Sequence, residues 1–134
     1  MPAANVPLAI EQGATFTLNF TWGVGTKIDG EWVRDDDENV IIVPYDISHC
    51  TARMQIREDY GDPVLVSITT EDGGITLGGV AGTVAMKISA EKTAVLDVQM
   101  ARYDLELVHQ SGDVDRLIEG VVTVDPNVTS TGSW

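Results

Sequence analysis

The stretch TFTLNFTW, residues 15–22, decides the fold class. Apolar and polar side chains alternate strictly along it. The apolar positions are Phe16, Leu18, Phe20 and Trp22, and the polar positions are Thr15, Thr17, Asn19 and Thr21. A period of two places each kind of side chain on its own face of a β-strand, so the stretch predicts a strand that covers a core on one side.

Segments on both sides of this stretch repeat the alternation between turn residues. They predict strands over Val6–Ile10, interrupted by Pro7, and over 51–57, 63–69, 74–77, 82–88, 102–109 and 114–124. We expect Val64, Val66 and Ile68 to point inward, and Ser89 to cap one helical turn over 89–94 that bridges the two sheets. Val, Ile and Thr number 40 against 8 Leu, which also favours strands. The prediction is an all-β antiparallel sandwich of about seven or more strands.

The 134 residues allow one domain. We expect a single sandwich over 1–126, with an extended loop or hairpin insertion at 23–45, and a C-terminal tail over 127–134. Within the insertion, 31–34 and 39–43 are expected to form a two-stranded flap.

Charge and composition exclude several classes of protein. The net charge of −13 opposes binding to nucleic acid. The longest apolar run, VIIV at 40–43, is too short to span a membrane. The first residues lack the basic region of a signal peptide, so we expect none. A single cysteine, Cys50, excludes an internal disulfide.

No motif predicts a cofactor or a metal. The acidic run DDDE, residues 35–38, is contiguous and no glycine follows it, so a solvated turn is favoured over a calcium loop. Adjacent His49 and Cys50 point to opposite faces of a strand and cannot share a zinc or catalytic site. His109 lies far along the chain, and no cysteine pair exists to complete a zinc tetrahedron. We expect no nucleophile–base pair, and Cys50 is expected to act as a small buried hydrophobe.

The last two strands predict a hairpin around the SG turn at 111–112. Counting back from that turn places His109 opposite Val114 and Leu105 opposite Ile118. Tyr103 then faces Gly120. Its position two residues before Leu105 has the spacing of a tyrosine corner.

The same register places four acidic residues close together on the outer face of this hairpin. Asp104 lies opposite Glu119, with Glu106 and Asp115 nearby and Leu117 and Val121 among them. Like charges in direct opposition are destabilising. The face is therefore either a docking surface that a basic partner completes, or a solvated surface relieved by Arg102 or Arg53.

Trp134 ends a tail of polar residues. A tryptophan on such a tail can bury a large apolar area in a neighbouring protein, so Trp134 is a second candidate interface residue, and a frayed terminus is the alternative.

Six short stretches occur in a familiar order. They are QGATF at 12–16, DI at 46–47 with TARMQIRE at 51–58, ITT followed by EDGGITLGG at 68–79, ISAEKTA at 88–94, RYDLELV at 102–108 and RLIEGVVTV at 116–124. Together they resemble small immunoglobulin-like structural proteins of tailed bacteriophages and prophages, similar to the N-terminal domain of baseplate upper proteins. The resemblance covers most of 12–129; the insertion at 23–45 and the Trp134 tail depart from it.

The resemblance implies an immunoglobulin-like sandwich that serves as a virion building block and carries over no active-site residue. We expect a non-enzymatic tail, baseplate or fibre-attachment component that assembles in the host bacterial cytoplasm. Its partners are other virion proteins and further copies of itself, with no cofactor, nucleic acid or membrane. A capsid decoration (cement) protein is the first alternative. A carbohydrate-binding host-attachment module is the second and requires exposed aromatics on one concave surface, for which the candidates are Trp22, Trp32, Tyr45, Tyr60 and Trp134.

Overall fold

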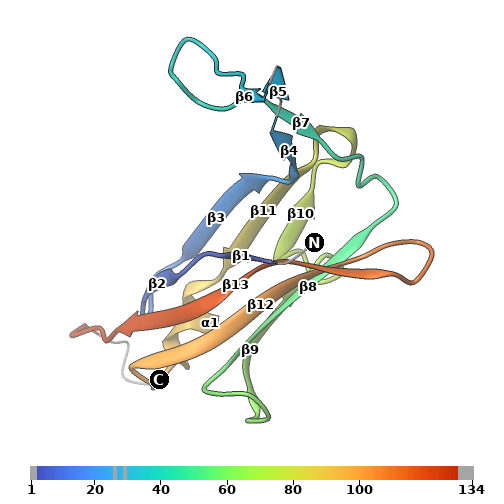
Figure 1. The fold of residues 1–134 in the computed structure, drawn as a ribbon. Coiled ribbons are helices and arrows are strands. Elements are labelled where there is room, and N and C mark those ends of the chain that lie inside the picture. The colour runs from blue at the N-terminus through green and yellow to red at the C-terminus, as the bar shows by residue number, and fades with distance from the viewer. Residues whose placement is uncertain (1–2, 26, 29, 130–134) are drawn as a thin grey trace.

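Two β-sheets pack face to face in the computed structural model, which describes residues 3–25, 27–28 and 30–129 (Figure 1). The larger sheet contains β1 (Ala4–Asn5), β2 (Leu8–Glu11), β13 (Val114–Asp125), β12 (Met100–Val108), β8 (Thr51–Arg57) and β9 (Val64–Thr69). The smaller sheet has the order β10 (Ile75–Leu77), β11 (Thr83–Ile88) and β3 (Phe16–Thr21). The predicted β-sandwich is confirmed.

The core lies between these sheets and is filled from alternate positions of their strands. Met54 on β8 faces Leu105 on β12, and both side chains are fully buried. Met86 and Ile88 on β11 close the core from the other sheet. The inward side chains of β3 are only half-buried. The core is thus tightest along β8, β11 and β12 and more open at β3.

The N-terminal segment pairs with β13 in parallel on both sides of Pro7. The prediction of a short edge strand broken by Pro7 is confirmed. The hydroxyl of Tyr103 donates a hydrogen bond to the Val6 carbonyl in this segment. In a tyrosine corner the hydroxyl bonds to backbone a few residues upstream of the tyrosine. Tyr103 bonds to Val6 instead, so the predicted tyrosine corner is wrong.

The β12–β13 hairpin confirms the predicted register only in the half that lies away from the turn. Leu105 lies opposite Ile118, but Val114 lies opposite Val108 and not opposite His109. The register shifts by one residue between Leu105 and Glu106. This β-bulge leaves Leu117 buried and corrects its predicted outward position.

A second bulge, between β8 and β9, shows that the predicted inward position of Val64 is wrong. The β8–β9 register shifts between Ile56 and Arg57, so Val64 is 40% exposed, whereas Val66 and Ile68 point inward as predicted.

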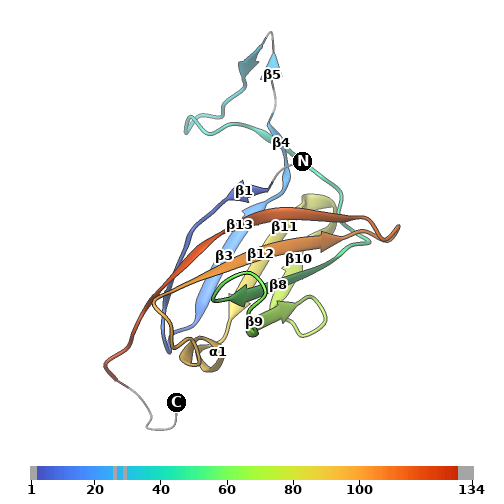
Figure 2. The ribbon, with the colours of Figure 1, turned by 60° about the horizontal axis from the view of Figure 1, so that its bottom comes forward.

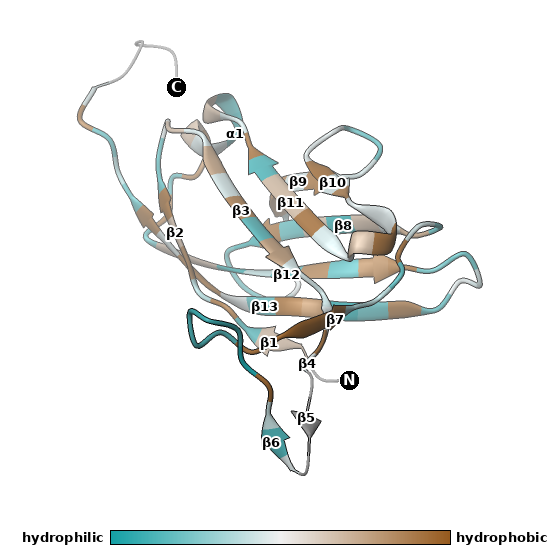
Figure 3. Ribbon diagram, turned by 90° about the horizontal axis from the view of Figure 1, so that it is seen from above, coloured by the Kyte–Doolittle hydropathy of each residue, from teal (hydrophilic) through white to brown (hydrophobic). Residues whose placement is uncertain are grey.

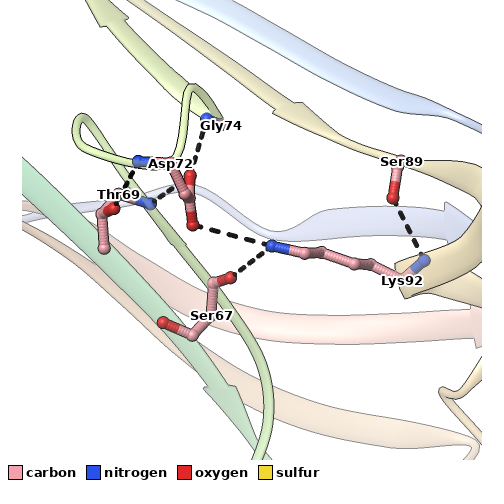
Figure 4. Close-up of polar contacts among 6 residues, drawn as sticks. All are labelled: Ser67, Thr69, Asp72, Gly74, Ser89 and Lys92. Carbon is pink, nitrogen blue, oxygen red and sulfur yellow. Dashed lines mark hydrogen bonds and ion pairs between the residues drawn. The ribbon is translucent and has the colours of Figure 1, made fainter.

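The helix α1 (Ala90–Ala94) connects β11 to β12 and contacts the edge of the larger sheet (Figure 4). Ser89 caps it as predicted, its hydroxyl accepting a bond from the Lys92 amide at 3.2 Å. The Lys92 ammonium donates to the Ser67 carbonyl of β9 at 2.9 Å and lies 3.7 Å from the Asp72 carboxylate. The predicted bridge between the sheets is confirmed. No helix formed by the described residues has the length and apolarity to cross a bilayer.

Residues 23–45 form an arm that projects from one end of the sandwich (Figures 1 and 2). Its strands are β4 (Gly23–Gly25) paired with β7 (Ile42–Pro44), and β5 (Lys27–Ile28) paired with β6 (Glu31–Trp32). The predicted pairing of 31–34 with 39–43 is correct only next to the acidic turn, where a bridge joins Arg34 to Val40. The rest of the prediction is wrong, because Glu31–Trp32 pairs with β5 and Ile42–Pro44 pairs with β4. At the base, the Tyr45 amide donates to the Trp22 carbonyl at 3.0 Å, and the two rings lie 4.5 Å apart.

Candidate interaction surfaces

Three of the four predicted acidic residues share the outer face of β12 and β13. Asp104 lies opposite Glu119, as predicted. The bulge places Arg116 opposite Glu106, and from there its guanidinium contacts both Asp104 and Glu119. Its Nε lies 3.5 Å from Asp104 Oδ2, and its Nη1 donates to Glu119 Oε2 at 3.1 Å. The chain therefore supplies its own cation to this like-charged pair.

Arg53 gives Glu106 a partner as well. Its Nε donates to Glu106 Oε1 at 2.8 Å across the β8–β12 pair. Of the two arginines suggested from the sequence, Arg53 reaches the acidic face, whereas Arg102 pairs with Asp59 at 3.4 Å. Sequence reasoning missed Arg116, because only the bulge turns it toward Glu106 and Asp104.

A hollow of about 520 Å³ lies over this face, bounded by β8, β12, β13 and the β8–β9 loop. Its most exposed aromatic is Tyr60, 79% exposed, whose ring lies 5.1 Å from the Arg102 guanidinium. Asp104 lines the hollow, and burial raises the pKa of its carboxyl, with the Glu106 carboxylate adding to the shift. Burial also raises the pKa of Tyr103 to about 12.

Asp115 lies apart from the other three acids. Its Oδ2 is 2.7 Å from His109 Nε2, and the other ring nitrogen, Nδ1, is 3.5 Å from Cys50 Sγ. The expectation that no nucleophile–base pair forms is thus wrong, because the Cys50 thiol contacts the His109 imidazole. Cys50 is also half-buried, whereas the sequence predicted a buried side chain. The two side chains come from strand ends 59 residues apart, a contact that no local pattern announces.

The Cys50, His109 and Asp115 side chains have the order of a thiol–imidazole–carboxylate triad. Such a site acts through the thiolate. Here burial raises the pKa of the Cys50 thiol, and the Asp46 and Asp115 carboxylates raise it further. The surroundings favour the neutral thiol, which is the unreactive form.

The arm carries exposed apolar side chains beside a strongly polar turn (Figure 3). Among the described side chains of the arm, the exposed aliphatic residues are Val24, Ile41, Ile42 and Val43. The Trp32 ring packs on Gly25, where an added Cβ would lie 2.5 Å from it.

The acidic turn at 35–38 is organised by the chain itself. Asp35 Oδ1 accepts bonds from the Asp37 and Asn39 amides at 2.9 and 3.0 Å, and Arg34 Nη1 donates to the Glu38 carbonyl at 2.8 Å. The described residues contain no group of three or more His, Cys, Asp or Glu side chains arranged to hold a metal ion. Trp134 lies outside the described residues, so its role as an interface residue remains a prediction.

Comparison with known proteins shows the fold. No family model matches the chain, and no curated protein matches it in sequence. Among solved structures, it is similar to a crystal structure of a chicken TCR, with a TM-score of 0.51 and 11% identity over 95% of this chain. The chain spans 57% of that protein's length. At this identity the likeness supports one conclusion: the chain is an immunoglobulin-like β-sandwich.

Proposed function

We propose that this chain is a non-enzymatic structural protein of a tailed-bacteriophage virion, a tail, baseplate or fibre-attachment component that docks to other virion proteins. The resemblance of residues 12–129 to phage immunoglobulin-like proteins supports the setting. The arm at 23–45 is the observation that carries the docking role. It stands outside the sandwich and contributes little to the buried core.

The arm has the character of a docking element. Val24 and Val43 lie opposite each other on β4 and β7, and both are exposed, as are Ile41 and Ile42 in the same segment of the chain. Clustered exposed aliphatic side chains mark protein interfaces, because a partner removes them from water. The acidic turn at 35–38 belongs to the same arm, so the proposed partner surface is an apolar socket with a basic rim.

The net charge supports a place on the outside of the particle. At −13, free copies repel one another and repel packaged DNA. The proposed protein therefore stays soluble in the host bacterial cytoplasm until a virion partner binds it. Further copies are expected beside it in the particle.

Two observations support this role over the alternatives. A nucleophilic enzyme needs a thiolate, which the raised pKa of Cys50 disfavours. A carbohydrate platform needs aromatics on one surface, but Trp22 packs on Tyr45 at the arm base, whereas Tyr60 lines the hollow. The capsid decoration alternative differs in copy number, since a shell is covered by many copies and a tail ring by a few.

The test removes the arm and leaves the sandwich. Residues 23–44 are replaced by an Asn-Gly turn, which joins Trp22 to Tyr45 where their backbones already bond at 3.0 Å. We expect a folded domain that no longer enters particles when it complements a phage lacking the gene. The matched control replaces Val114, exposed on the other hairpin, with Ser, and enters normally. Normal incorporation of the arm-less protein would overturn the docking role.

A further inference from the structure

Three of the four edges of the two sandwich sheets are protected against addition of another strand. The β9 edge follows Pro63, and the Lys92 ammonium occupies its Ser67 carbonyl at 2.9 Å (Figure 4). The β1–β2 edge is split by Pro7, which has no N–H. The β10 edge is only three residues long. Natural sheets use such devices to prevent pairing between molecules.

The fourth edge, β3, carries none of these devices. It has six residues without proline or charge, and its register with β11 runs unbroken from Phe16–Ile88 to Thr21–Thr83. Figure 3 shows β11 on one side of β3 and β2 on the other, but β2 pairs with β13, and no described strand other than β11 pairs with β3. The backbone groups on the outer edge of β3 are therefore left without a strand partner among the described residues.

The side chains of β3 also lack full cover. Phe16, Leu18 and Phe20 point to the core but stay half-buried, whereas Val84 and Met86 on the neighbouring β11 are 1% exposed. One more strand beside β3 would remove the remaining apolar surface from water.

The charge distribution identifies the occupant as a second copy. The chain carries −13, yet the three strands of the smaller sheet contain no acidic residue and one basic residue, Lys87. The larger sheet carries its acids on β2, β12 and β13. Two copies that approach through β3 bring together their least charged surfaces.

The sequence of β3 is also complementary to itself. Opposite residues of an antiparallel pair point to the same face. Because FTLNFT alternates strictly, pairing with a second β3 places Phe and Leu against Phe and Leu on the core side, and Thr and Asn against Thr and Asn on the outer side.

We propose that two copies of this chain associate by antiparallel pairing of their β3 strands, so that the smaller sheets of both copies become one continuous sheet. This proposal goes beyond the proposed function and does not depend on the virion role, because it concerns the isolated protein.

The test is sedimentation equilibrium of the full chain over a range of concentrations and salt. We expect a reversible dimer that tightens as salt rises, because ions screen the repulsion between two copies of charge −13. Asn19→Lys places a cation at the exposed outer side of β3 and should raise the Kd roughly fivefold or more through like-charge opposition across the new pair. Thr17→Lys is the second variant, and far-ultraviolet circular dichroism confirms that each is folded.

Thr76→Lys is the matched control. It adds the same charge to an exposed position of the same sheet, two strands from β3, and should leave the Kd unchanged. Hydrogen exchange provides the second readout: the β3 amides that do not bond to β11 should gain protection only at concentrations where the dimer forms. A monomer at every concentration, equal Kd values for Asn19→Lys and Thr76→Lys, or protection of these outer-edge amides in dilute monomer would overturn the proposal.

Discussion

The sandwich and the arm each contain a cross-strand pair of aliphatic side chains, and the two pairs have opposite environments. Met54 and Leu105 face each other on β8 and β12 and are fully buried. Val24 and Val43 face each other on β4 and β7 and are 46% and 58% exposed. Strand pairing alone does not bury a side chain; a second layer does, and only the sandwich has one.

The largest expected effect tests the buried pair. Leu105→Ala should lower the free energy of unfolding by about 2–5 kcal/mol, because it leaves a cavity between packed sheets. Phe16→Ala should cost less, since Phe16 is half-buried on β3. Thr17→Ala, an exposed outer position, should be nearly neutral in urea denaturation. Thr17→Ala as the worst of the three would reverse the assignment of the faces.

A glycine pair tests whether the arm unfolds separately. Gly82 has a φ of +66°, and an added Cβ would lie 2.7 Å from the Trp22 carbonyl oxygen, so Gly82→Ala should cost about 1–3 kcal/mol. Gly30, in the arm, has a φ of +83° with no atom within 4 Å of an added Cβ. Its strain should confine itself to the arm, and Gly30→Ala should leave the melting temperature of the sandwich unchanged. An equal drop for both would mean that arm and sandwich unfold together.

Local periodicity predicted the sandwich because its strands alternate strictly. The inward and outward faces of β3, β8 and β11 follow from that alternation. The Ser89 cap was predicted separately, from the position of this serine before a short helical stretch. Periodicity failed at Val64 and Leu117, since each lies at a bulge that adds a residue without changing composition.

Side-chain contacts between distant strand ends could not be predicted from the local sequence pattern. Cys50 reaches His109 only because β8 and β12 pair, and Arg116 reaches Asp104 only because the hairpin bulges. The acidic face was therefore predicted in its main pair, Asp104 and Glu119, but without the cation that relieves it.

The turn that joins the two sheets should respond to pH. Asp72 Oδ1 accepts bonds from the Gly74 and Thr69 amides at 2.8 and 3.1 Å, and these bonds hold the pKa of its carboxyl below the usual 3.8. A lowered folded-state pKa gives stability that is present above 3.8 and lost as pH falls through the folded value. Asp72→Asn should therefore destabilise the protein at pH 6 and converge with wild type in strong acid. A difference that stays constant with pH would exclude a contribution from the charge.

Cys50 tests the triad-like cluster. Because burial raises the pKa of its thiol, alkylation by iodoacetamide at neutral pH should be slower than that of free cysteine. His109→Ala should not slow it further. Faster alkylation than free cysteine, lost in His109→Ala, would show that the imidazole activates the thiol.

The smallest expected effect is on the exposed pair in the arm. Val24→Ser with Val43→Ser removes two aliphatic side chains that already contact water, so the free energy of unfolding should stay within about 0.5 kcal/mol of wild type. The same double variant should weaken incorporation into particles, because a partner gains little from burying two hydroxyl groups in an apolar socket. Stability and docking are thereby separated: Leu105→Ala lowers the first, and the arm variant lowers the second. If the arm variant instead unfolds as easily as Leu105→Ala, the two valines support the sandwich, and the contrast between the covered and the uncovered pair fails.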